Sequence, residues 1–119
     1  MFTVYGINNC DTVRKALKWF DEEGLDYGFV DFRKNGLEKP IAAKWIQTLG
    51  WESVINKRST TWRNLGDLER KCLNDDTAVA LVCVHPTLIK RPVIVYKGIF
   101  LQGFTEKTKS QIKGLVEHS

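Results

Sequence analysis

The sequence has few cysteines and no long hydrophobic run. Its three cysteines, Cys10, Cys72 and Cys83, are an odd number with no close pair, so neither a disulfide framework nor a zinc site is indicated. No stretch approaches the roughly 18 apolar residues that a membrane span needs, and the N-terminus lacks the basic-then-apolar order of a signal peptide. We therefore expect reduced thiols, no metal, no membrane contact and a cytoplasmic location.

A large excess of charge of one sign is also absent. Eighteen Lys and Arg against fourteen Asp and Glu give a formal charge of +4, which does not require nucleic acid as a partner and suits a small anionic ligand as well. The 119 residues, 43% hydrophobic and 27% charged, are enough for one globular domain with an adequate core. The sequence therefore predicts a single domain over residues 1–119.

Cys10 lies at a predicted junction between a strand and a helix. Residues 2–5 form a short apolar run, and an amphipathic helix begins near Asp11. The N–H groups and the positive dipole end of a helix N-terminus stabilise an anion such as a thiolate, which can lower a cysteine pKa from about 8.5 to about 3.5–7.5. The alternative is a buried structural cysteine, but the polar neighbours Asn8 and Asn9 favour a reactive thiol in a turn.

The order of the other elements indicates an α/β fold. The first helix ends near Gly24, and a strand at 27–32 then completes a βαβ unit with parallel strands. Near the C-terminus, a hairpin with its turn at Lys97-Gly98 precedes a helix that begins at Thr105. We predict a mixed four-stranded sheet in the thioredoxin-like arrangement, with a helical insertion at about residues 40–85 between its two halves.

Helices are expected in this insertion at 40–49, 65–73 and 77–84. Residues 33–39 before it are predicted to be a loop. Asp76 is a plausible N-cap for the last helix, although the Val-rich part of that helix is also compatible with a strand. Cys72 and Cys83 fall on apolar helical faces and are expected to be core thiols, and His85 is expected to be a cap or loop residue.

Three motifs carry a resemblance to a known family. GINNCDTVRKA at 6–16, NKRSTTWRNL at 56–65 and HPTLIKRPVIV at 85–95 occur in the order and at the separations found in the arsenate reductase-like (ArsC) family. The residues of these motifs are most similar to those of the YffB-like branch, with Spx-type regulators as more distant relatives. The resemblance covers nearly the whole chain and implies a thioredoxin-like fold with its redox-active cysteine at Cys10.

The resemblance also implies a site for an anion. Arsenate reductases of the family hold their oxyanion with arginines, and two of those positions match Arg58 and Arg91. The planar guanidinium fork suits an oxyanion or a carboxylate. Taken alone, Arg58 could be a solvated loop residue and Arg91 a salt-bridge partner. Because both arginines occupy the motif positions of the family, anion binding is favoured. We expect Arg91 to lie near the Cys10 thiolate and lower its pKa further, which makes Cys10 and Arg91 the predicted catalytic residues.

Two positions depart from the arsenate reductase pattern. Gly103 stands where those enzymes have a third arginine, and Gly6 stands where they have a histidine, which weighs against arsenate reduction. Spx-type regulators carry a CxxC pair, whereas here Val13 stands three positions after Cys10, so no local disulfide can form. The thiol that resolves a disulfide on Cys10 must therefore come from elsewhere.

Glutathione is the expected source of that thiol. Its carboxylates suit the arginines, and its peptide backbone can pair with the chain beside Pro92. In thioredoxin-like folds the proline before the third strand is usually cis, and Pro92 fits that position. The predicted substrate and glutathione site comprises Asn9, Asp11, Arg58, Arg63, Arg91 and Pro92.

These features predict a glutathione-dependent monothiol reductase. Cys10 attacks a disulfide or another oxidised substrate, such as the disulfide of a small thiol or an oxyanion compound, and glutathione resolves the product, with a glutaredoxin as a further partner. Two alternatives stay open: an Spx-like regulator that binds a protein, as Spx relatives contact RNA polymerase, and an arsenate reductase. The missing CxxC pair and the two arginines favour the reductase.

Overall fold

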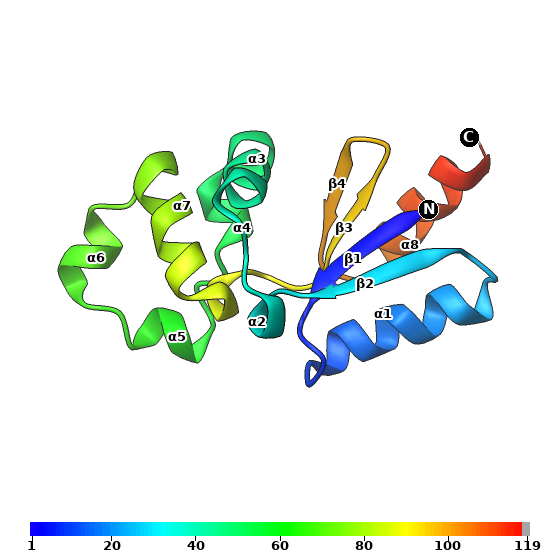
Figure 1. Ribbon diagram of the computed structural model, residues 1–119, viewed down its shortest axis with the longest axis horizontal. Coiled ribbons are helices and arrows are strands. Elements are labelled where there is room, and N and C mark those ends of the chain that lie inside the picture. The colour runs from blue at the N-terminus through cyan, green and yellow to red at the C-terminus, as the bar shows by residue number, and fades with distance from the viewer. Residues whose placement is uncertain (118–119) are drawn as a thin grey trace. The chain divides into compact units, whose positions relative to one another are not determined.

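The computed structural model of the protein describes residues 1–117. The chain divides into two compact units, whose elements are labelled in Figure 1. The first comprises Met1–Val30 and the segment that begins at Arg91, and the second comprises Asp31–Lys90. The helical segment is therefore longer than the predicted insertion at about residues 40–85. That the 119 residues act as one domain stays a prediction.

The first unit is built on a four-stranded sheet with the order β2-β1-β3-β4. Its elements are β1 (Phe2–Gly6), α1 (Asp11–Glu22), β2 (Tyr27–Asp31), β3 (Val93–Tyr96), β4 (Ile99–Gln102) and α8 (Glu106–Glu117). The neighbouring strands β1 and β2 run in the same direction (Figure 1), whereas β3 is antiparallel to both β1 and β4. This mixed sheet, with its βαβ and ββα halves, confirms the predicted thioredoxin-like α/β fold.

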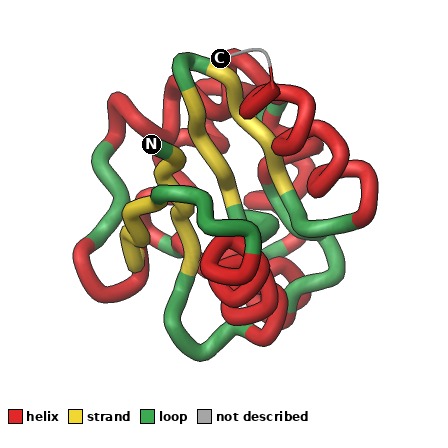
Figure 2. Tube along the Cα trace, turned by 90° about the vertical axis from the view of Figure 1, so that its right-hand side faces the viewer, coloured by secondary structure: helices red, strands yellow, loops and turns green. Residues whose placement is uncertain are grey.

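Helices α1 and α8 pack on the same face of this sheet, and Figure 2 draws the strands in yellow and the helices in red. On β1, Phe2 and Val4 point to one face because alternate residues of a strand share a face, and Val4 lies opposite Ile94 of β3. These side chains pack against Phe20 of α1 and Ile112 of α8, and all five are at most 3% exposed. The sheet and both helices therefore share one apolar core, which holds α1 in place.

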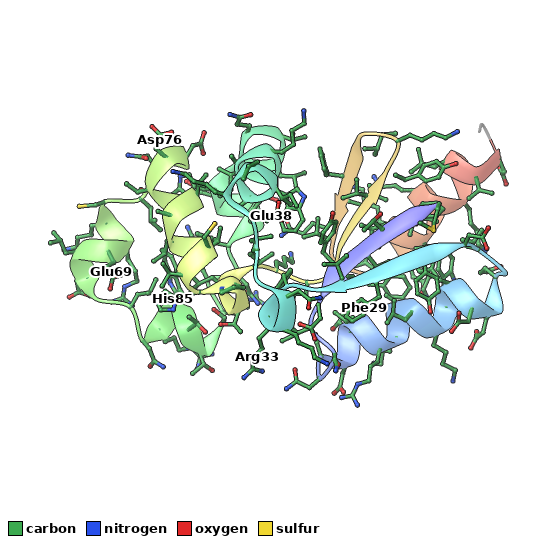
Figure 3. The ribbon with its side chains drawn as sticks, viewed as in Figure 1. Phe29, Arg33, Glu38, Glu69, Asp76 and His85 are labelled. Atoms are coloured by element: carbon green, nitrogen blue, oxygen red, sulfur yellow. The ribbon has the colours of Figure 1, made fainter. Side chains whose placement is uncertain are left out.

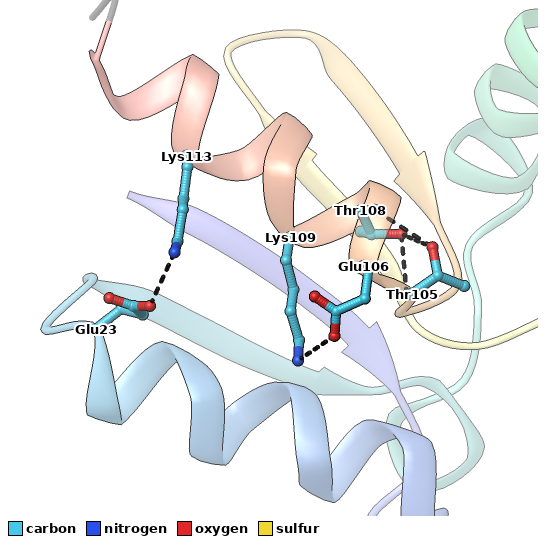
Figure 4. Close-up of polar contacts among 6 residues, drawn as sticks. All are labelled: Glu23, Thr105, Glu106, Thr108, Lys109 and Lys113. Atoms are coloured by element: carbon cyan, nitrogen blue, oxygen red, sulfur yellow. Dashed lines mark hydrogen bonds and ion pairs between the residues drawn. The ribbon is translucent and has the colours of Figure 1, made fainter.

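Local sequence explains the hairpin and the start of the last helix. Lys97 and Gly98 have φ values of 47° and 78°, as the tight turn of a two-residue hairpin requires. Before α8, the Thr105 hydroxyl accepts a hydrogen bond from the Thr108 backbone N–H, and the Thr108 hydroxyl accepts one from the Thr105 N–H, each at 3.3 Å (Figure 4). Both predicted features are confirmed.

The second unit is helical. Its elements are α2 (Phe32–Asn35), α3 (Lys39–Leu49), α4 (Trp51–Val54), α5 (Thr60–Arg63), α6 (Asp67–Lys71), α7 (Asp75–Val84) and the short 3-10 helix η1 (Pro86–Leu88). Helix α3 packs on α7, and the fully buried side chains include Trp45, Ile46, Val54, Val82 and Leu88. No helix in residues 1–117 is long and apolar enough to cross a membrane.

Two predictions about helix starts in this unit are wrong. Residues 33–39 are not all loop, because the Asp31 carboxylate accepts hydrogen bonds from the Arg33 and Lys34 N–H groups, each at 3.0 Å, and starts α2. The N-cap of α7 is Asn74, whose Oδ1 accepts from the N–H of Thr77 at 3.0 Å. Asp76 instead lies in the first turn of α7 (Figure 3).

The prediction that Cys72 is a core thiol is also wrong. Helix α6 ends at Lys71, and Cys72 follows it as an exposed C-cap. Leu68, on the apolar face expected here, is also exposed, at 75%. Cys83 on α7 is half-buried, and burial raises the pKa of its thiol, an effect that nearby Lys39 opposes. His85 caps the C-terminus of α7, as expected (Figure 3).

Candidate active site

Cys10 is the N-cap residue of α1. Its backbone is extended, with φ −99° and ψ 123°, and its carbonyl accepts the first helical hydrogen bond from the Arg14 N–H at 3.0 Å. Its own N–H donates to the Ile7 carbonyl at 3.3 Å, which closes the turn between strand and helix. The side chain is half-buried and makes no capping hydrogen bond. The predicted position at a helix N-terminus is confirmed, and a thiolate there lies beside the N–H groups of the first turn.

Gly6 and Val13 form a tight contact between β1 and α1. A β-carbon added at Gly6 would lie 2.6 Å from Cγ2 of Val13, far inside the separation of about 3.5–4.0 Å at which carbon atoms attract. Val13 is fully buried, so its side chain has little room to move. The missing side chain at Gly6 therefore lets α1 lie close to β1 and sets the position of the turn that carries Cys10.

The peptide bond between Arg91 and Pro92 is cis, as predicted. Pro92 is buried directly before β3, and the Nε atom of Arg91 is buried as well. Tyr5 of β1 lies opposite Val93 of β3, and extending this antiparallel register places Pro92 and Arg91 beside the chain that leaves β1. That chain leads to Cys10, so the sheet brings Arg91, Pro92 and Cys10 to the same end.

Gly103 completes this end of the sheet. Its N–H donates to the Pro92 carbonyl at 2.9 Å, and its φ of 83° lies in the left-handed region that favours glycine. A residue with a side chain would be strained there. The backbone conformation at position 103 therefore favours the glycine that the sequence has there over an arginine.

The two remaining predicted residues of this unit lie next to Cys10. Asn9 is an exposed turn residue, and Asp11 is the first residue of α1. The Asp11 carboxylate accepts a hydrogen bond from the Arg14 guanidinium at 2.8 Å, in an ion pair whose side chains are largely exposed and which adds little stability. Their contacts with glutathione stay predictions.

Arg58 lies in a loop of the second unit that is held by its own hydrogen bonds. Asn56 Oδ1 accepts from the Arg58 N–H at 3.0 Å, and the Ser59 hydroxyl donates to the Asn56 carbonyl at 2.8 Å. The same hydroxyl accepts from the Trp62 N–H at 3.1 Å and so caps α5. The Arg63 guanidinium donates to the Arg58 carbonyl at 2.9 Å. Arg63 therefore positions the loop, and its predicted contact with glutathione stays a prediction.

The Arg58 loop borders a polar hollow of about 560 Å³ within the second unit. Its lining includes three cations, Lys57, Arg58 and Lys90, and one acid, Glu52. The Lys57 Nζ atom lies 5.2 Å from the centre of the Trp51 ring, a distance at which a cation interacts favourably with an aromatic face. The excess of positive charge suits an anion. Lys57 was not among the predicted site residues, although its place next to Arg58 is visible in the sequence.

The predicted site residues are divided between the two units. Asn9, Cys10, Asp11, Arg91 and Pro92 belong to the first unit, and Arg58 and Arg63 belong to the second. That both sets act on one ligand stays a prediction. Within residues 1–117, no group of three or more His, Cys, Asp or Glu side chains could hold a metal ion.

Comparison with known proteins found a matching family and several similar proteins. The model of the ArsC family matches residues 5–112. An uncharacterized protein of Haemophilus influenzae is 46% identical over 107 residues, which cover 90% of this chain and 94% of that protein. The global transcriptional regulator Spx of Bacillus subtilis is 26% identical over 113 residues, 89% of this chain and 82% of the regulator.

The solved structure of a YffB protein is also similar to this chain. It has a TM-score of 0.88 and 33% sequence identity, with 93% of this chain and 97% of that protein covered. The range matched by the family model runs from residue 5 to residue 112 and so contains the positions of Cys10, Arg58 and Arg91, and the structural match spans nearly all of both chains. This chain is therefore a member of the ArsC family.

Proposed function

We propose that the protein is a glutathione-dependent thiol reductase in which Cys10 is the nucleophile. The observation that carries this proposal is the position of Cys10 as the N-cap of α1, at the end of the sheet where the cis Arg91–Pro92 bond lies. The helix N-terminus stabilises the thiolate, and the thiolate is the attacking form of cysteine. Three free cysteines fit a reducing compartment, and we place the activity in the cytoplasm.

The reaction proceeds by two thiol–disulfide exchanges. For a substrate thiol that is disulfide-bonded to glutathione, the Cys10 thiolate attacks the glutathione sulfur, a Cys10–glutathione disulfide forms, and the substrate leaves as a thiolate. A second glutathione thiolate then attacks the bound glutathione sulfur. Oxidised glutathione leaves, and Cys10 returns as a thiolate. Val13 stands where a second cysteine would be needed for an internal resolving step, so the second thiol is external, from glutathione or from a glutaredoxin.

Charge explains the choice of glutathione over an uncharged thiol. The hollow lined by Lys57, Arg58 and Lys90 offers cations to a carboxylate, and Arg91 lies at the Cys10 end of the sheet. A hydrogen bond to a charged group contributes about 1.5–3 kcal/mol, and solvent screening lowers this for an exposed side chain such as Arg58. We therefore assign Arg91 to the reacting sulfur and Arg58 to a carboxylate of glutathione.

A regulator that binds a protein partner is the second candidate. The similarity to Spx supports it, because 89% of this chain matches a global transcriptional regulator. The buried Val13 argues against a redox switch of the CxxC kind in such a role. Arsenate reduction is less favoured than either, because Gly103 supplies no guanidinium at the position where arsenate reductases of the family have a third arginine.

The direct experiment is intact-mass measurement after incubation with oxidised glutathione. We expect one added glutathionyl group on the wild type, none on Cys10→Ser, and its removal by reduced glutathione. Cys72→Ser is the matched control, because Cys72 is the more exposed thiol and is not at a helix N-terminus. If the adduct forms on Cys72 while Cys10 stays unmodified, the reductase proposal fails and the regulator becomes the better candidate.

A further inference from the structure

The first unit carries a hollow of its own on its surface, separate from the hollow beside Arg58 in the second unit. It has a volume of about 300 Å³ and is lined by residues of α1, of the segment before α8 and of α8 itself. We call it the α1–α8 groove. Its lining residues are Lys15, Lys18, Trp19, Glu22, Phe104 and Lys109.

The spacing of the α1 residues explains why one side of the groove is continuous. Lys15, Lys18, Trp19 and Glu22 follow the i, i+3, i+4, i+7 pattern that places side chains on one helix face. The buried residues of α1 follow a different stripe and face the core. Helix α1 therefore has a second side-chain stripe beside its core-facing stripe, in which Trp19 packs partly against the core while Lys15 and Lys18 are exposed.

Two aromatic rings form the apolar part of the groove. The Trp19 and Phe104 rings meet edge to face, with their centres 5.7 Å apart. Both side chains are partly exposed, and the Lys109 Nζ atom lies 5.3 Å from the centre of the Phe104 ring. An apolar side chain of a partner can pack on this surface while its charged neighbours meet lysines.

The three groove lysines differ in their ion pairs. Lys15 makes no ion pair with any of residues 1–117. The Lys18 Nζ atom lies 3.9 Å from Glu22, and both side chains are more than half exposed, so this pair is weak. Lys109 pairs with Glu106 at 3.2 Å (Figure 4). The three lysines face Glu22 in the lining and Glu106 beside it, so the groove has a net charge of +1, with Lys15 as its lysine without an ion pair among the described residues.

We propose that the α1–α8 groove docks an acidic segment of a partner protein, with an apolar side chain on Trp19 and Phe104 and carboxylates on the lysines. A protein segment fits better than nucleic acid, because Glu22 in the lining and Glu106 beside it would repel an unbroken line of phosphates. A segment with a few separate carboxylates can avoid them.

The groove lies on the helix that carries Cys10. Lys15 is five residues from Cys10, which corresponds to about 7.5 Å along the helix axis at 1.5 Å per residue. The groove would thus bring a partner's disulfide near Cys10 for the exchange described above. That last step rests on the proposed function, whereas binding in the groove does not.

The test uses a fluorescein-labelled peptide of glutamates around a central leucine, and the same peptide with glutamine in place of each glutamate. Binding is measured by fluorescence anisotropy and by the NMR signal of the Trp19 indole N–H, assigned with Trp19→Phe. We expect the acidic peptide to shift that signal and the glutamine peptide not to. Lys15→Glu with Lys18→Glu should weaken binding by at least about tenfold.

The matched control is Lys34→Glu with Lys44→Glu, which replaces two exposed lysines of the second unit. It changes the net charge of the protein by the same amount as the Lys15 and Lys18 variant. We expect less than a twofold effect from it. Equal weakening by both double variants, equal binding of both peptides, or tighter binding of oligothymidylate with the same Trp19 shift would overturn the proposal.

Two further measurements separate this proposal from the reductase. Cys10→Ser should bind the peptide like the wild type, and the Lys15/Lys18 double variant should still accept glutathione on Cys10. Loss of peptide binding in Cys10→Ser would contradict an independent groove. Failure of Cys10 to react in the wild type, with peptide binding intact, would refute the reductase alone.

Discussion

Replacing Gly6 with alanine is expected to destabilise the protein through a contact with one side chain. The new methyl group would lie 2.6 Å from Val13 Cγ2, and Val13 is fully buried in the packing between α1 and β1. Overpacking a core of this kind costs about 1–3 kcal/mol. Chemical denaturation of Gly6→Ala should show a loss of that size in the free energy of unfolding, with the slope against denaturant unchanged.

A double-mutant cycle identifies Val13 as the cause. Val13→Ala alone removes two buried methyl groups and should cost about 2 kcal/mol, since each contributes roughly 0.8 kcal/mol before any cavity effect. In the double variant the new methyl group at position 6 occupies the space that Val13 leaves, so the combined loss should be smaller than the sum by at least about 1 kcal/mol. Additive losses would refute the claim that this contact positions α1.

Three further results are expected. Gly103→Ala should destabilise by about 1–2 kcal/mol because its φ is 83°, whereas Gly114→Ala, at an open position inside α8, should be neutral or stabilising; equal effects in denaturation would count against the backbone argument. Arg91→Ala should weaken glutathione binding in calorimetry roughly tenfold and slow alkylation of Cys10, whereas Arg58→Ala should weaken binding alone; unchanged affinity in both would remove the glutathione site. Arsenate turnover, coupled to glutathione and glutaredoxin, should stay far below that of an arsenate reductase, and comparable turnover would show that the glycine at 103 does not prevent the reaction.

The parts of the fold that depend on local patterns could be predicted from the sequence. Cys10 follows an apolar strand and precedes an amphipathic helix, so its place at the helix N-terminus was visible without a structure. The turn at Lys97-Gly98 and the cis bond before Pro92 also depend on residues that are neighbours in sequence. The short helix after Asp31 was missed because the polar, glycine-containing sequence of this segment indicated a loop. In the structure the Asp31 carboxylate caps the segment and it forms one helical turn.

Features that depend on tertiary contacts could not be predicted in the same way. The sequence showed Gly6 and Val13 as departures from family patterns, but only the distance between helix and strand shows that they touch. Cys72 was placed on an apolar helical face, whereas α6 ends one residue earlier and leaves it exposed. The spacing of Lys15, Lys18, Trp19 and Glu22 on one side of α1 is visible in the sequence, but the contact between Trp19 and Phe104 requires the folded chain.

The most direct test of the central claim compares the three thiols of the chain at neutral pH. The rate of alkylation by iodoacetamide should be measured for each cysteine by peptide mass analysis, over a range of pH. Under the proposed function Cys10 should react fastest near pH 7 because it is the N-cap of α1, and Cys83 should react slowest because burial raises its pKa. If exposed Cys72 reacts as fast as Cys10 at neutral pH, Cys10 is not an activated nucleophile and the account of a thiol reductase is contradicted.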